Sequence, residues 1–398
     1  MKLADRVQLV KPSPTLALNA RAKALAAAGV DVVGFAAGEP DFDTPDFVKA
    51  AAVEAIRQGF TKYTATAGIP ELRAAICEKL KKDNNMSFTP EQVLVSAGAK
   101  HSLYNLFQAL LSPGDEVVIL APYWVSYPDM VLLAGGRPVF VGTREEDGYA
   151  PDPRALEQAF TPRTRAVIVN SPSNPTGAVL GREALAAIGK AIAARGDVLL
   201  VTDDIYEKLI YVDGPFLNAA NVVPELADRT VVVNGASKAF AMTGWRMGYA
   251  AGPKPLIAAM QMVQDQSTSN CSSITQKAAL AALQGPTEPL EKMVAEYRVR
   301  RDLFVSGLNA IPGVTCRLPE GAFYVFPNVH GWMGKQFKGK SLDGSVAISE
   351  ALLDEFKVAA VPGFPFGAEG FLRMSFVTSR ANLEKGLGRL RDFAAALG

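Results

Sequence analysis

Apolar runs of strand length alternate with stretches of helical spacing through most of this 398-residue chain. The runs at 165–169, 197–201 and 230–233 are rich in Val, Ile and Leu. Strands that are buried on both faces of a parallel sheet have this composition. Their alternation with helical stretches, for example at 100–111 and 183–194, predicts an α/β fold whose large domain has a doubly wound, mostly parallel sheet.

The C-terminal part of the chain has a different pattern. A long helical stretch covers residues 288–309, and short apolar runs and further helical stretches follow it. We interpret this part as a smaller α+β domain that the N-terminal arm completes. The predicted domains are a large one at 46–310 and a small one at 1–45 and 311–398. Short strands are expected at 314–317, 323–326 and 371–376, and helices at 345–356 and 382–396.

Composition and charge exclude several classes of protein. Lys and Arg number 41 against 40 Asp and Glu, so the net charge of +1 gives no electrostatic reason to expect nucleic acid or a membrane as a partner. The first residues lack the apolar core of a secretory leader, and no run approaches the roughly 18 apolar residues of a membrane span. We therefore expect a cytoplasmic protein. With 3 Cys outside any CxxC pair and 2 His, we expect neither a disulfide framework nor a metal site.

Polar and charged residues follow three of the predicted parallel strands. In open α/β sheets, ligands bind beyond the carboxyl ends of the strands. Each segment alone has an ordinary alternative, because NPTG is a good turn, an acidic pair can cap a strand end, and a lysine usually lies on the surface. Their joint occurrence favours a binding site. The residues are Asn174 after the first strand, Asp203 and Tyr206 after the second, and Ser237, Lys238 and Arg246 after the third.

This combination of side chains suits a pyridoxal phosphate site. A lysine amine forms a Schiff base with the aldehyde cofactor, whose ring then acts as an electron sink. An ionised carboxylate keeps the ring nitrogen protonated, while a phenol and an amide tune the ring oxygen. Arginine, a hydroxyl group and a helix N-terminus hold the phosphate. The segment Gly98, Ala99 and Lys100 opens a predicted helix and supplies that terminus, although an ordinary glycine turn is the alternative.

Several sequence segments together carry a family resemblance. They include AGEPDFDTP, KYTATAGIPELR, SAGAKHSLYNLF, APYWVSYPDM, NSPSNPTG, DDIYEKL, SKAFAMTGWRMGY, GAFYVFP and FLRMSF. The chain resembles class I pyridoxal phosphate aminotransferases of fold type I, in the branch of bacterial aspartate and aspartate/prephenate aminotransferases. The resemblance implies ping-pong transamination from L-aspartate to 2-oxoglutarate, with prephenate as a further substrate.

The resemblance implies a role for each residue at the cofactor. Lys238 would hold the cofactor and move the proton at the substrate α-carbon, and Asp203 would pair with the ring nitrogen. Tyr206 and Asn174 would bind the ring oxygen, and Trp124 would stack on the ring. The family usually has Glu after this Asp, where the chain has Asp204. The phosphate would be bound by the segment Gly98, Ala99 and Lys100 together with Ser237 and Arg246.

The resemblance also implies how the substrate is bound. Arg373 would bind the α-carboxylate as a bidentate fork, with Gly38, Trp124 and Asn174 bordering the substrate. Animal-type and enteric aspartate aminotransferases use a second arginine, from the neighbouring subunit, for the side-chain carboxylate. Residues 264–276 do not show that element.

Two lysines are candidates for the side-chain carboxylate instead. In the bacterial branch a lysine at the position of Lys100 takes this role, and a solvent-facing helix lysine is the alternative. Lys11, in the N-terminal arm, would also face the substrate. A basic residue at that position is associated with the use of prephenate.

Tyr63 implies a homodimer. It resembles the family tyrosine that reaches the phosphate site of the neighbouring subunit, so that two subunits would form two composite active sites. A packed loop aromatic is the alternative for this residue.

Three other functions remain open from the sequence. One is an aromatic or kynurenine-type aminotransferase, which an apolar side-chain pocket would favour. A second is a pyridoxal phosphate lyase or decarboxylase on the same fold, which would share Lys238 and Asp203. The third is a non-catalytic cofactor-binding regulatory protein, which needs an attached DNA-binding region; the extent of the resemblance leads us to expect none.

Overall fold

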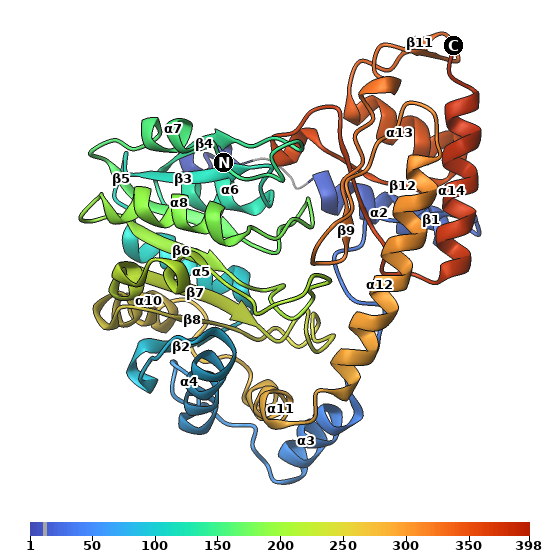
Figure 1. Cartoon of the computed structure of the whole chain (residues 1–398). Helices are drawn as coiled ribbons and strands as arrows, with labels where there is room; N and C mark the ends of the chain where they lie inside the picture. The colour runs from blue at the N-terminus through green and yellow to red at the C-terminus, as the bar shows by residue number, and fades with distance from the viewer. Residues whose placement is uncertain (11–13) are drawn as a thin grey trace.

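A seven-stranded sheet forms the centre of the larger part of the computed structural model, which describes residues 1–10 and 14–398 (Figure 1). The strand order is β2-β8-β7-β6-β5-β3-β4, and only β8 runs antiparallel to its neighbours. This confirms the predicted α/β fold with a mostly parallel sheet. The strands are β2 (Val93–Ser96), β3 (Glu116–Ala121), β4 (Arg137–Gly142), β5 (Thr164–Asn170), β6 (Leu199–Asp203), β7 (Thr230–Gly235) and β8 (Gly248–Ala251).

Helices cover both faces of this sheet, because successive residues of a strand point to opposite sides. Val167 and Leu200 pack in a core cluster with α4, α8 and α11, whereas Ile168 and Val201 pack with α5, α6 and α10. The helices are α3 (Asp46–Arg57), α4 (Pro70–Asn84), α5 (Ala99–Leu110), α6 (Ser126–Leu133), α7 (Pro153–Gln158), α8 (Arg182–Ala193), α9 (Ala219–Val222), α10 (Lys254–Asp265) and α11 (Ser273–Gln284), with the 3₁₀ turns η1 (Pro90–Gln92) and η2 (Pro224–Arg229).

The long helix α12 (Glu288–Asn309) leads from the large sheet to a second group of elements, at the right of Figure 1. A separate core there includes Phe304, Trp332 and Phe393. Both ends of the chain contribute, since β1 (Val33–Gly34) pairs with β12 (Val358–Ala359). The remaining elements are α1 (Asp5–Gln8), α2 (Pro14–Ala27), β9 (Tyr324–Val325), η3 (His330–Trp332), β10 (Gln336–Phe337), β11 (Lys340–Ser341), α13 (Ser345–Phe356), β13 (Val361–Pro362), η4 (Phe364–Phe366), β14 (Leu372–Ser375) and α14 (Arg380–Ala395).

The strands of this second part are shorter than the sequence predicts. Residues 314–317 make only an isolated bridge between Thr315 and Asn328. The side chain of Asn309 bonds both the N–H and the C=O of Cys316, so this backbone is satisfied without a continuing strand partner. The predicted strands at 323–326 and 371–376 are reduced to β9 and β14.

The register of the parallel strands places polar residues side by side at one edge of the sheet. Asn170 lies opposite Asp203, and Asp203 lies opposite Val233 on β7. The chain leaves β7 at this edge and reaches Lys238 within a few residues. Among the described residues, no helix is both long and apolar enough to span a membrane.

Candidate active site

A cavity of about 440 Å³ opens at the carboxyl edge of the parallel strands. Its walls come from the ends of β5, β6 and β7, from the start of α5, and from β9 and β14. Small-molecule sites commonly have such a volume and lie at this edge of the sheet. The sequence-predicted residues that line it are Gly38, Ala99, Lys100, Trp124, Asn174, Asp203, Tyr206, Ser237, Lys238, Arg246 and Arg373.

Lys238 follows β7, and its amine lies between the backbone of Gly38 and the rings of Tyr206 and Phe323. Nζ donates a hydrogen bond to the carbonyl oxygen of Gly38 at 2.6 Å, and it lies 5.9 Å from the ring centroid of Tyr206. Burial, which disfavours the charged form, lowers the pKa of Lys238 to about 8, although Glu39 opposes this shift. The neutral amine, which is a nucleophile and a base, is therefore far more populated near pH 7 than in an exposed lysine.

Asp203, at the end of β6, is a buried carboxylate with 4% of its surface exposed. Tyr127 of α6 donates a hydrogen bond to its Oδ2 at 2.6 Å, and the N–H of Ile205 lies 3.4 Å from Oδ1. Burial raises the pKa of Asp203 to about 6, while the Tyr127 hydrogen bond opposes this shift. Asp203 has no ion-pair partner in the described part of the chain. A cation in the cavity would provide one.

Arg373 of β14 presents a buried guanidinium on the opposite wall. Nη2 donates to the carbonyl oxygen of Ala36 at 2.9 Å, and Nη1 donates to Oδ1 of Asn174 at 3.3 Å. Its Nε–H is buried and has no partner within residues 1–10 and 14–398. A buried N–H without an acceptor is costly, and the guanidinium as a whole is a charged partner for a carboxylate bound in the cavity.

An anion-binding corner lies at the N-terminus of α5, where backbone N–H groups are free of helical partners. Gly98 has φ +95°, and a Cβ there would lie 2.4 Å from Nη2 of Arg246, so the guanidinium approaches the backbone closely. Arg246 also donates to the carbonyl oxygens of Thr243 at 2.9 Å and Ala97 at 3.3 Å. With the buried Ser237, these groups form a cradle for an anion such as phosphate.

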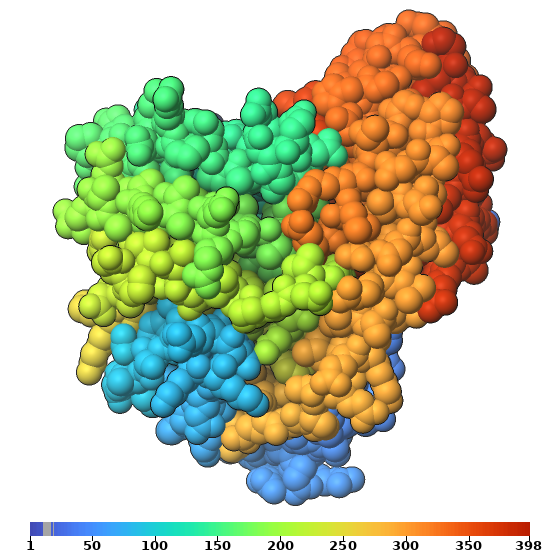
Figure 2. Space-filling model, in the orientation of Figure 1, coloured from blue at the N-terminus to red at the C-terminus, as the bar shows by residue number. Residues whose placement is uncertain are grey.

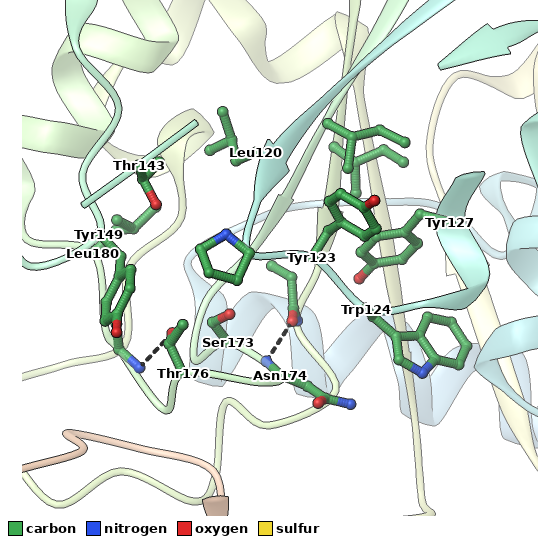
Figure 3. Close-up of a pocket in the computed structure, with 15 residues that line it drawn as sticks. Leu120, Tyr123, Trp124, Tyr127, Thr143, Tyr149, Ser173, Asn174, Thr176 and Leu180 are labelled. Carbon is green, nitrogen blue, oxygen red and sulfur yellow. Dashed lines mark hydrogen bonds between the residues drawn. The ribbon is translucent and has the colours of Figure 1, made fainter. Parts of the chain in front are cut away.

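Lys100 lies on the first turn of α5 and borders the same cavity. Its Nζ is 4.9 Å from the ring centroid of Trp124, which itself packs edge-on against Tyr127 at 5.3 Å (Figure 3). Burial, followed by the charge of Arg246, lowers the pKa of Lys100, while Asp129 raises it. The ammonium is thus placed where a second carboxylate could reach it.

A much smaller cavity of about 30 Å³ lies behind Asn174 and Trp124 (Figure 3). The N–H of Asn174 donates to Oδ1 of Asn170 at 2.9 Å, which fixes the loop between the two cavities. The hydroxyl of Tyr149 is buried in this region without a partner in the described residues. A cavity of this size and polarity accommodates ordered water.

The structure does not place two other sequence-predicted residues in this cavity, for different reasons. Tyr63 is 92% exposed and does not line the cavity of its own chain. Lys11 lies outside the described residues.

Sequence reasoning missed several residues of the cavity. Tyr127 and Tyr324 line it, as do Glu39 and Thr243, which are joined by a hydrogen bond of 2.9 Å. Tyr127 stands in the APYWVSYPDM segment, but its contact with Asp203 depends on how α6 packs on the sheet. An alternation of aromatic and polar residues is too common to reveal such a partner.

Comparison with known proteins identifies the family. The sequence profile of the aminotransferase class I and II family matches residues 30–390, so the chain belongs to this pyridoxal phosphate-dependent family. The chain is 52% identical to an aspartate/prephenate aminotransferase of Cereibacter sphaeroides and 48% identical to an aspartate aminotransferase of Geobacillus stearothermophilus. The alignments cover 99% of both chains in the first case and 100% in the second.

Solved structures agree with this assignment. The fold is similar to a crystal structure of the Rhizobium meliloti aspartate aminotransferase, with a TM-score of 0.96, 44% identity and complete coverage of both chains. It is also similar to the Thermus thermophilus aspartate aminotransferase with maleate, with a TM-score of 0.92, 48% identity, and coverage of 98% and 99% of the two chains. The chain is thus an aminotransferase of fold type I.

The residues present fit pyridoxal phosphate. The cofactor has an aldehyde, a basic ring nitrogen and a phosphate, and the cavity offers an amine of lowered pKa, a buried unpaired carboxylate and an anion cradle. Each group of the cavity therefore has a chemical complement on the cofactor.

The burial of Asp203 predicts an unusual effect on stability. The carboxyl has a folded-state pKa of about 6 against an ordinary 3.8. Its favourable contribution to the free energy of unfolding is therefore fully present below pH 3.8 and is lost as the pH rises through 6. The difference corresponds to about 3 kcal/mol at pH 8. We therefore expect Asp203→Asn to stabilise the cofactor-free protein relative to wild type at pH 8, and much less at pH 4, in urea unfolding experiments.

The matched control is Asp228→Asn, which changes an exposed carboxylate. It should leave the free energy of unfolding almost unchanged at both pH values. A destabilisation by Asp203→Asn that is equal at pH 4 and pH 8 would contradict the interpretation.

Proposed function

We propose that the protein transfers the amino group of L-aspartate to 2-oxoglutarate, with prephenate as a further substrate. The observation that carries this proposal is the presence of the Lys238 amine and the Arg373 guanidinium in one cavity. An amino acid substrate needs both a base at its α-carbon and a partner for its α-carboxylate. The relatives named aspartate and aspartate/prephenate aminotransferases support the choice of substrate.

Lys238 is proposed as the base that moves the proton at the substrate α-carbon. Pyridoxal phosphate, when bound, supplies an electron sink for this proton transfer. Asp203 would stabilise a protonated ring nitrogen, and Tyr127 supports the ionised form of Asp203 by donating to it. Tyr206 and Asn174 would donate to the ring oxygen, and Trp124 would cover the ring face.

The phosphate is assigned to the corner formed by Gly98, Ala99, Lys100, Ser237 and Arg246. The helix N-terminus and the guanidinium both favour a dianion.

Arg373 is proposed to bind the α-carboxylate, with Gly38 leaving room beside it. Lys100 is proposed to bind the side-chain carboxylate of dicarboxylic substrates. The Thermus thermophilus relative was solved with the dicarboxylate maleate, which supports a dicarboxylic substrate. The role of Lys11 toward prephenate remains part of the proposal.

The working unit is proposed to be a cytoplasmic homodimer. Each subunit has a large domain at 46–310 and a small domain formed by 1–45 and 311–398. Tyr63 is 92% exposed, so its ring is available for contact with a second subunit. Tyr63 is assigned to the phosphate of the partner's site.

The first prediction from the proposed function concerns Lys238. Lys238→Ala removes the base, and we expect the turnover of L-aspartate with 2-oxoglutarate to fall by about 10²- to 10⁴-fold or more. The control Lys190→Ala removes an exposed lysine of α8 and should retain wild-type turnover. Undiminished turnover by Lys238→Ala would refute the assignment.

The second prediction concerns Lys100. Lys100→Met keeps the length of the side chain and removes its charge. A charge-assisted hydrogen bond contributes about 1.5–3 kcal/mol, so kcat/KM for L-aspartate should fall by about one to two orders of magnitude. The value for L-phenylalanine, which has no side-chain carboxylate, should change little. An equal loss with both substrates would argue against this role.

The third prediction tests the composite site. Co-expression of Lys238→Ala chains with Tyr63→Ala chains yields mixed dimers in which one site has both the intact lysine and the intact tyrosine. We expect each variant alone to have low activity and the mixture to recover activity. If the mixture is no more active than the better single variant, Tyr63 does not serve the neighbouring subunit.

A further inference from the structure

Tyr324 connects the two halves of the cavity. Its hydroxyl lies 3.0 Å from the hydroxyl of Tyr206, at hydrogen-bond distance. The Cζ atom of Arg373 lies 4.7 Å from the centroid of the Tyr324 ring, in cation–π geometry. Tyr324 has 1% of its surface exposed and lines the cavity.

We propose that Tyr324 is a positioning residue with two separable functions: its ring orders the guanidinium of Arg373, and its hydroxyl strengthens Tyr206 as a hydrogen-bond donor. This inference rests on the proposed function, which assigns the substrate carboxylate to Arg373 and the cofactor ring oxygen to Tyr206.

The sheet places Tyr324 and Arg373 together. Tyr324 on β9 pairs with Ser375 on the antiparallel strand β14, and Arg373 lies two residues before Ser375. Residues two apart on a strand share a face, so Arg373 is the diagonal neighbour of Tyr324 on that face. Such neighbours lie within reach of an aromatic and a long side chain.

Arg373 is held on several sides before any ligand binds. Besides the Tyr324 ring, the ring of Phe366 lies 5.3 Å from Cζ, and Nη2 bonds the carbonyl oxygen of Ala36. The plane of the guanidinium is thereby fixed while its Nε–H stays unpaired. An ordered guanidinium loses less conformational entropy when it binds a carboxylate, and its affinity for the carboxylate is therefore higher.

The hydroxyl of Tyr324 acts on the cofactor side. When Tyr206 donates to the ring oxygen, its own oxygen can only accept, so Tyr324 must be the donor of the bond between them. A phenol that accepts a hydrogen bond becomes a stronger donor, and it stabilises a negatively charged acceptor more. A Cβ at Gly38 would lie 3.2 Å from the Tyr324 hydroxyl, which is a tight contact. Glycine at this position therefore leaves room for the hydroxyl.

Two variants separate the functions of the ring and the hydroxyl. Tyr324→Phe removes the hydroxyl and keeps the ring, whereas Tyr324→Leu removes both. The control Tyr211→Phe removes another buried tyrosine hydroxyl, which bonds the carbonyl oxygen of Ala322 and does not line the cavity. The readouts are the pH midpoint of the absorption change of the bound cofactor and the dissociation constant of the unreactive dicarboxylate maleate.

We expect Tyr324→Phe to raise the spectroscopic pKa of the bound cofactor by about 0.3–1 unit, because the charged ring oxygen loses support. Its dissociation constant for maleate should stay within about twofold of wild type. Tyr324→Leu should raise this dissociation constant by about 3- to 30-fold, which is the range of a desolvated cation–π contact. Tyr211→Phe should change neither readout.

A wild-type spectroscopic pKa in Tyr324→Phe would overturn the function of the hydroxyl. Because phenylalanine keeps the shape of the core, this test remains valid if Tyr324→Leu fails to fold. Wild-type binding of maleate by a folded Tyr324→Leu protein, or a loss of binding already complete in Tyr324→Phe, would overturn the function of the ring. If the wild-type spectrum does not respond to L-aspartate, the proposed function fails, whereas both measurements still decide the role of Tyr324.

Discussion

Charged groups without ion-pair partners around one cavity are the constraint on which this structure depends. Asp203 and Arg373 are buried and Lys238 is partly buried, and none of them forms an ion pair in the part of the chain that the structure describes. Isolated charges are costly in such surroundings, and the pKa shifts of Asp203 and Lys238 express this cost. The packed strands around these groups maintain their arrangement. A ligand of complementary charge offsets the cost of burying them.

The packing that holds these groups comes from distant parts of the chain. The seven-stranded sheet positions Asp203 and Lys238, because their strands are parallel and in register. The second part of the structure brings Gly38 and Arg373 to the same cavity, because β1 near the N-terminus pairs with β12 near the C-terminus (Figure 1). In the space-filling view the two parts meet along an extended boundary (Figure 2). In the proposed function, substrate and cofactor groups would thus be recognised from opposite walls.

The sequence alone was sufficient for the central parallel strands and for most of the cavity residues, but it did not predict β4 or the antiparallel β8. Apolar runs locate buried strands, and polar residues that follow parallel strands must share one edge. The contact of Tyr127 with Asp203 and that of Tyr324 with Arg373 depend on the packing of α6 and on the register of β9, which no local pattern encodes. The strand expected at 314–317 does not form, because the side chain of Asn309 bonds the backbone N–H and C=O of Cys316.

The most direct test is a half-reaction. Cofactor-loaded protein receives L-aspartate without any 2-oxo acid, and the absorption of the cofactor and the release of oxaloacetate are recorded together. We predict that L-aspartate changes the absorption band of the bound cofactor and that oxaloacetate appears in an amount equal to the number of active sites. L-Phenylalanine at the same concentration should react far more slowly. An unchanged band with no oxaloacetate would contradict the proposed transamination, and a response to L-phenylalanine alone would contradict the dicarboxylate preference.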